Sequence, residues 1–240
     1  QTAGVGRLLR SFMAEFRSSW RHVSAYRMHK IAWAYRGFPF WRVPSQLLLV
    51  FSTQAPMLFI ASFYGQQITG QFGLAVTALS VPVALIGQSA GKALYGEATR
   101  TYIKDPANVV KMARNTQISL FSIAIIPAAL LFLFGEMMFI LVFGYQWRLA
   151  GTFASILTIS MLFQFTSSPL MSLFNILSNQ SIYLGINIFR VVGLVLVFWV
   201  GSRYVNEPVD LVMVYSLFNS LFYLLVSIIL FHMLKNKFPK

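Results

Sequence analysis

The chain has 240 residues, of which 57% are hydrophobic and only 10% charged, and its formal net charge is +13. A soluble domain carries about a quarter charged residues, so these few charges cannot cover the surface of a water-soluble protein of this length. The apolar side chains must face lipid, where helices satisfy their own backbone hydrogen bonds. The composition therefore predicts an all-α integral membrane protein. The absence of cysteine excludes a disulfide framework and a thiolate metal site.

Residues 1–43 form a basic segment that precedes the first apolar run. Within it, residues 7–42 mix Arg and Lys with Phe, Trp and Tyr. This mixture predicts an amphipathic helix at the surface of an anionic leaflet. Nucleic-acid binding is the alternative for so basic a segment, but the membrane spans that follow argue against it. The chain begins with Gln1 and shows no signal peptide, so we expect a processed N-terminus or a fragment.

A helix that spans a membrane needs about 20 mostly apolar residues. Six segments meet this requirement: 44–64, 72–96, 116–134, 149–171, 182–200 and 210–234. Short Gly/Gln-rich or charged connectors separate them. The apolar run 137–143 is too short to cross, so it either lies in the opposite interface or continues the third helix. We expect a six-helix transmembrane bundle over residues 44–234, followed by a basic tail at 235–240.

The positions of Lys and Arg predict the orientation of this bundle. One side of the membrane receives 15 of these residues, the other receives only Arg148 and Arg203, and two fall inside spans. Cytoplasmic loops carry the excess of Lys and Arg. Both termini are therefore expected in the cytoplasm. This distribution also accounts for the net charge without a nucleic-acid partner.

Four spans contain a proline, which a membrane helix tolerates when neighbours or water satisfy the freed carbonyl. The candidate helix hinges are Pro56, Pro82, Pro127 and Pro169. Amide side chains also occur at or near membrane depth, where polar groups usually face a bundle interior or a wet cavity. The candidate cavity-lining residues are Gln54, Gln88, Gln164 and Asn187. Hydrogen bonding between helices is the alternative role for these amides.

Lys92 and Arg190 are the two basic residues inside the spans. Arg190 is eight residues into the fifth span, about 12 Å deep at the helical rise of 1.5 Å per residue. A cation at this depth indicates a functional site, and the spans offer no well-buried carboxylate as its partner. Both residues are candidate contacts for an anionic, phosphate-bearing substrate. The alternative is that each snorkels to the interface or, for Arg190, bonds backbone carbonyls.

Residues 87–91 read GQSAG and match the G-x-S-x-G pattern of serine hydrolases. That motif needs a strained strand-to-helix turn, whereas these residues lie in an apolar helix. Two glycines four apart instead predict close helix packing. An intramembrane serine hydrolase would pair Ser89 with a histidine such as His232, so replacing Ser89 separates the two interpretations. No spacing predicts a metal site, and we expect no cofactor and no enzymatic activity.

Three stretches, 44–98, 134–151 (FGEMMFILVFGYQWRLAG) and 167–180 (SSPLMSLFNILSNQ), resemble a known family. They are similar to the C-terminal half of bacterial polysaccharide flippases, the O-antigen and lipopolysaccharide translocases of the multidrug/oligosaccharidyl-lipid/polysaccharide exporter superfamily. Members of this family consist of two six-helix lobes around a central cavity. The resemblance implies that the chain is the second lobe and that residues 1–43 are the end of a preceding helix plus the connector.

The resemblance also implies a function: translocation of a lipid-diphosphate-linked oligosaccharide across the bacterial inner membrane. The expected partners are membrane lipid, this substrate, and a missing N-terminal lobe or a second copy of the chain. A drug or ion antiporter of the same superfamily is the alternative. It predicts carboxylates within the spans, and the spans offer none in depth.

Overall fold

The computed structural model describes residues 30, 33, 37–174 and 180–237, and within them all regular structure is helical. The predicted interfacial helix at residues 7–42 falls mostly outside the described residues. The chain divides into two units, Gln1–Pro44 and Ser45–Lys240. The second unit contains the expected membrane bundle, and its architecture is described below.

The elements follow one another with short connections. In chain order they are α3 (Gly37–Lys104), α4 (Pro106–Phe143), η1 (Tyr145–Trp147), α5 (Arg148–Ser167), η2 (Ser168–Leu173), α7 (Gln180–Tyr204) and α8 (Pro208–Lys237). Five helices of the described part are long and apolar enough to cross a membrane. Six spans were predicted, and the difference arises because the first two predicted spans both lie within α3.

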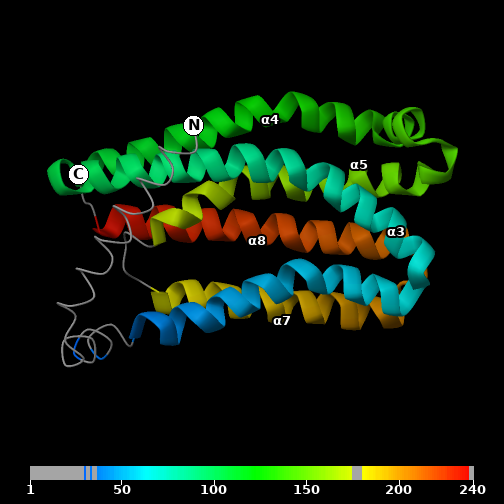
Figure 1. Cartoon of the computed structure of the whole chain (residues 1–240), viewed down its shortest axis with the longest axis horizontal. Helices are drawn as coiled ribbons and strands as arrows, with labels where there is room; N and C mark the ends of the chain where they lie inside the picture. Colours follow the sequence, from blue (N-terminus) through cyan, green and yellow to red (C-terminus); the bar gives the residue numbers. More distant parts are fainter. Residues whose placement is uncertain (1–29, 31–32, 34–36, 175–179, 238–240) are drawn as a thin grey trace, which may run out of the picture. The chain divides into compact units, whose positions relative to one another are not determined.

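α3 contains one non-helical residue, Gly65, with φ 79° and ψ −179°. Positive φ is accessible to glycine because it lacks a Cβ. Beyond Ser45 the ribbon of α3 runs in one direction, bends near the label and returns (Figure 1). The glycine- and glutamine-rich connector predicted at residues 65–71 is thus reduced to a single non-helical residue, and Gln66 to Gln71 belong to the returning helix.

α4 is longer than the predicted third span. It begins after Asp105, whose carboxylate accepts a hydrogen bond from the Asn108 amide at 3.3 Å, and it continues to Phe143. The apolar run 137–143 therefore continues the third helix. The helix stops at Gly144, whose φ of 96° reverses the chain into η1 and α5.

The burial of α4 shows which solvent the bundle faces. The most apolar stretch of α4, within Asn108–Phe143, has a mean hydropathy of 2.4, yet only 11% of it is buried. A soluble protein would place its most apolar helix inside. Large side chains such as Leu133 and Leu141 point outward instead, at 67% and 83% exposure. This pattern is that of helices that face lipid, so the chain is a multi-pass membrane protein.

Two buried clusters hold the helices together, one towards each end of the bundle. Phe72, Phe153 and Phe198 belong to the cluster near Gly65 and η1. Leu170, Phe174 and Phe222 belong to the cluster near the opposite end. Hydrogen bonds supplement this packing. Gln117 donates to Ser227 at 3.1 Å, and Ser227 donates to Ser167 at 2.8 Å, so α4, α8 and α5 are linked within the bundle.

Candidate functional site

A cavity of about 530 Å³, lined by both polar and apolar residues, lies between the returning half of α3 and the junction of α5 with η2. We call it the Lys92 cavity. Its polar lining residues are Ser80, Gln88, Lys92, Tyr95, Gln164, Ser168 and Ser172. The α3 residues of this set are separated by eight, four and three positions, so they share one face of the helix. Four candidates meet here: Gln88 and Lys92 from α3, Gln164 from α5 and Pro169 from η2.

Glycines on α3 bring η2 close to this cavity. A Cβ on Gly91 would lie 3.3 Å from the Cα of Pro169, and one on Gly87 would lie 3.6 Å from Ser168 Oγ. Ser172 Oγ donates to the Gly91 carbonyl at 3.4 Å and to the Pro169 carbonyl at 2.8 Å. The GQSAG segment is therefore a packing surface for η2, in keeping with its glycine spacing.

Ser89 has no catalytic surroundings in the described structure. It lies in the unbroken second half of α3, and its hydroxyl donates to the Leu85 carbonyl of the same helix at 2.8 Å. His232 Nε2 lies 2.9 Å from Asn236 Nδ2, again within one helix. Each side chain is thus hydrogen-bonded along its own helix rather than to the other.

Lys92 is the cation of the cavity. Its side chain is exposed, and the cavity lining contains no carboxylate. Among the described residues the one ion pair is Glu136–Arg148, which lies elsewhere. The charge of Lys92 is therefore uncompensated by the described part of the chain. The side-chain amides of Gln88 and Gln164 supply further hydrogen-bond donors for an anion, whereas the hydroxyls of Ser80 and Ser172 donate to backbone carbonyls.

Arg190 has a different environment. It is only 4% exposed and lies between α7 and α8, with its Cζ 5.3 Å from the ring centroids of both Phe222 and Tyr223. Its Nε has no hydrogen-bond partner among the described residues. The Oδ1 of Asn187, one turn earlier on α7, is likewise unpaired, while Asn187 Nδ2 donates to the Tyr183 carbonyl at 2.9 Å. Two complementary orphan groups on one helix face can be satisfied by a water or a ligand atom.

The remaining predicted site residues are scattered. Gln54 is exposed on α3. Pro56 is buried within α3, and Pro82 and Pro127 line an apolar cavity of about 160 Å³ between α3, α4 and α5. Pro169 is the second residue of η2, after the end of α5, and it lines the Lys92 cavity. The sharp break of the described helices occurs at Gly65, which we had not singled out as a hinge.

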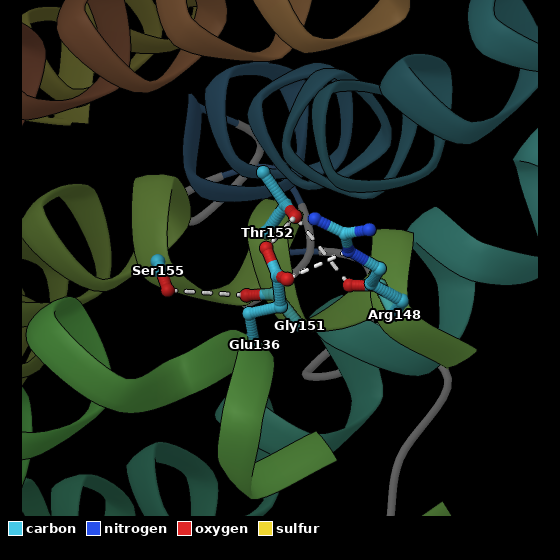
Figure 2. A network of polar contacts seen from close by, with 5 residues as sticks. All are labelled: Glu136, Arg148, Gly151, Thr152 and Ser155. Atoms are coloured by element: carbon cyan, nitrogen blue, oxygen red, sulfur yellow. Dashed lines mark hydrogen bonds and ion pairs between the residues drawn. The ribbon is translucent and has the colours of Figure 1, made fainter. Parts of the chain in front are cut away.

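Sequence reasoning also missed a polar network at the other end of the bundle. Glu136 Oε1 accepts a hydrogen bond from Arg148 Nε at 2.6 Å, and Glu136 Oε2 accepts one from Thr152 Oγ1 at 3.3 Å (Figure 2). In the sequence, Glu136 lies between two predicted spans, and Arg148 enters only the count of basic residues that predicts the orientation. The sequence signal for this ion pair was the presence of opposite charges 12 positions apart on either side of Gly144.

The comparison with known families agrees with this membrane architecture. The model of the polysaccharide biosynthesis protein family matches residues 5–151, which is more than half of the chain. The chain belongs to this family. No curated protein and no solved structure matches it. Within this polysaccharide biosynthesis protein, Gln88, Lys92 and Glu136 lie inside the matched region, whereas Gln164, Asn187 and Arg190 lie beyond it.

Proposed function

We propose that this polysaccharide biosynthesis protein translocates a lipid-diphosphate-linked oligosaccharide across the bacterial inner membrane. The observation that carries the proposal is the Lys92 cavity: an uncompensated cation, amides and hydroxyls gathered between apolar helices. An intramembrane cation is costly unless it meets an anion or water. A diphosphate head group is the anion that a polysaccharide precursor on a lipid carrier would present. Binding and movement suffice, and no covalent chemistry is needed.

The proposal includes six crossings, with α3 crossing twice. The apolar helix within α3 runs over 61 residues, Arg42–Tyr102. At 1.5 Å per residue it would be about 90 Å long if straight, against a hydrocarbon core of about 30 Å. The reversal at Gly65 resolves this mismatch. An even number of crossings puts both termini on one side, and the 15-to-2 division of basic residues favours the cytoplasm.

We further propose that the chain acts as one lobe of a two-lobed transporter, with a preceding lobe or a second copy as its partner. Alternating access then follows from rocking one lobe against the other. An antiporter of the same superfamily is less well supported. It needs carboxylates for cation coupling, and none of the described carboxylates is buried. Glu136 is in addition paired with Arg148. An intramembrane hydrolase is disfavoured by the hydrogen bonds of Ser89 and His232.

The test is a charge-neutral substitution of the cavity lysine in cells that depend on this protein for surface polysaccharide. A hydrogen bond to a charged group contributes about 1.5–3 kcal/mol. Lys92→Gln should therefore lower export about tenfold or more, and precursor should accumulate on the cytoplasmic leaflet. Lys92→Arg should retain most activity. The matched control is Lys111→Gln, because Lys111 is also an exposed lysine but lies on α4, away from the cavity.

Protein abundance in the membrane is measured in parallel by immunoblotting. Normal export by Lys92→Gln at normal abundance would contradict the assignment of Lys92 to the substrate. An equal loss in Lys92→Gln and Lys111→Gln would indicate a general effect of surface charge rather than a contact in this cavity.

A further inference from the structure

A second cavity, of about 590 Å³, lies at the opposite end of the returning half of α3 from Lys92. We call it the Tyr145 cavity. Three segments form its walls: the start of the returning half of α3, the end of α4, and the turn from η1 into α5. Its polar lining includes Gln67, Gln71, Glu136, Tyr145, Arg148 and Thr152. None of these residues was a candidate on sequence grounds.

Hydrogen bonds hold the walls of this cavity in place. Gln71 Nε2 donates to the Gln146 carbonyl at 2.6 Å, and Gln71 Oε1 accepts from the Ala150 amide at 3.0 Å, so α3 is fixed to the η1–α5 turn. Across the cavity, Glu136 holds both Arg148 and Thr152 (Figure 2). A site with fixed walls loses little conformational entropy when a ligand binds.

The charges of the Tyr145 cavity cancel, which distinguishes it from the Lys92 cavity. The guanidinium of Arg148 is neutralised by Glu136 at 2.6 Å, and no other ionised side chain belongs to its lining. An anion therefore gains little here. What the cavity still offers is the Gln67 amide, the other guanidinium N–H groups of Arg148, and the ring of Tyr145, which is 70% exposed. The cavity therefore offers both hydrogen-bond donors and hydrogen-bond acceptors beside the face of an aromatic ring.

We propose that the Tyr145 cavity binds a sugar ring of the oligosaccharide. Hydroxyl groups both donate and accept, which matches amide, carboxylate and guanidinium partners, and the apolar face of a sugar ring can lie on an aromatic side chain. The proposal rests on the proposed function for its substrate. It adds a glycan-binding site that is separate from the site for the diphosphate.

The position of the cavity indicates when it is used. Gln71 and Lys92 lie on the same uninterrupted part of α3, 21 residues apart. At 1.5 Å per residue this separation is about 32 Å, close to the thickness of the hydrocarbon core. The two cavities thus open towards opposite sides of the membrane. The Tyr145 cavity receives sugar after it has crossed, which favours the forward direction of transport and the release of the head group from Lys92.

The experiment measures binding of lipid-free sugars to the full chain in lipid nanodiscs by saturation-transfer difference NMR. The probes are methyl glycosides of glucose, galactose, rhamnose, N-acetylglucosamine and glucuronic acid, with inorganic pyrophosphate as competitor. We expect at least one glycoside to bind. Gln67→Ala and Tyr145→Ala should each raise its Kd about tenfold, equivalent to about 1.4 kcal/mol. Tyr145→Phe keeps the ring while removing the interaction of the hydroxyl with Arg148, and it should bind nearly as well as the unaltered protein.

Two control variants carry the same chemical changes outside the cavity. Gln66 is the exposed neighbour of Gln67, and Tyr204 is an exposed tyrosine at the end of α7. Neither lines the cavity. Gln66→Ala and Tyr204→Ala should leave the Kd unchanged, and thermal unfolding of all five variants verifies that each is folded.

Absence of saturation transfer to every glycoside would overturn the proposal, as would equal Kd values in the cavity and control variants. Displacement of the sugar by pyrophosphate would overturn the assignment of a neutral ligand. These outcomes are independent of the export test on Lys92. Translocation without sugar binding refutes the glycan site alone, and sugar binding without translocation refutes the proposed function alone.

Discussion

The close approach of α4 and α5 leads to a sharp prediction for Gly151. A Cβ placed on Gly151 would lie 2.5 Å from the Glu136 Cα, 2.8 Å from the Gly135 carbonyl oxygen and 3.0 Å from the Phe139 Cβ. Two of these three contacts are with backbone, which a rotamer change cannot move. Gly151→Ala must therefore push the two helices apart.

The cost can be worked out against a matched glycine. Overpacking costs about 1–3 kcal/mol and occasionally more, whereas Gly→Ala in an unobstructed helix gains up to about 1 kcal/mol. Gly185 lies within α7, and nothing comes within 4 Å of a Cβ built on it. We expect Gly151→Ala to lower the free energy of unfolding by about 2 kcal/mol. Gly185→Ala should not lower it, although the chemical change is identical.

Steric-trap unfolding in bicelles measures the free energy of unfolding of both alanine variants under the same conditions. The Glu136–Arg148 pair supplies a second readout, because separation of α4 from α5 lengthens its 2.6 Å contact and weakens sugar binding in the Tyr145 cavity. Equal stability of the two alanine variants would show that α4 and α5 do not pack as closely as described. The described geometry of the Tyr145 cavity, which depends on this packing, would then also be wrong.

Three further predictions concern function and topology. Arg190→Leu should insert normally but export less polysaccharide, measured by surface labelling at matched abundance; normal export would exclude an anion contact at Arg190. Ser89→Ala should retain full export, since a transporter does not use this hydroxyl, and complete loss would instead favour a hydrolase. A tag inserted after Asn206 should react with an impermeant label in intact cells, while one after Lys240 should react only after permeabilisation; the reverse pattern would invert the proposed orientation.

The helical spans were predictable because their signal is composition averaged over many residues. α7 and α8 extend beyond the predicted 182–200 and 210–234 by only two to four residues at each end. The break between the first two spans was predicted, but not its form. Of the six residues after Gly65, five are polar or glycine and resemble a loop in sequence, yet all six remain helical because one glycine with positive φ suffices to reverse the chain.

The candidate site was only partly predictable, because its members come from distant segments. Gln88 and Lys92 could be paired from their spacing on one helix, whereas Gln164 joins them only through the packing of α5 and η2 on α3. Glu136 was overlooked because the run after it was too short to count as a span. Its partners Arg148 and Thr152 become visible once α4 is seen to continue and then reverse at Gly144.

The distribution of exposed polar groups supports the interpretation of the bundle as one lobe of a larger assembly. Residues 123–134 of α4 contain no polar side chain, so this part of the surface can face lipid throughout. In contrast, Gln54 on the first half of α3, and Gln88 and Lys92 on its returning half, are exposed between apolar stretches. Facing lipid, such groups would cost several kcal/mol in total. They are stable if α3 faces water or a partner instead, which is where a lobe must line a shared cavity.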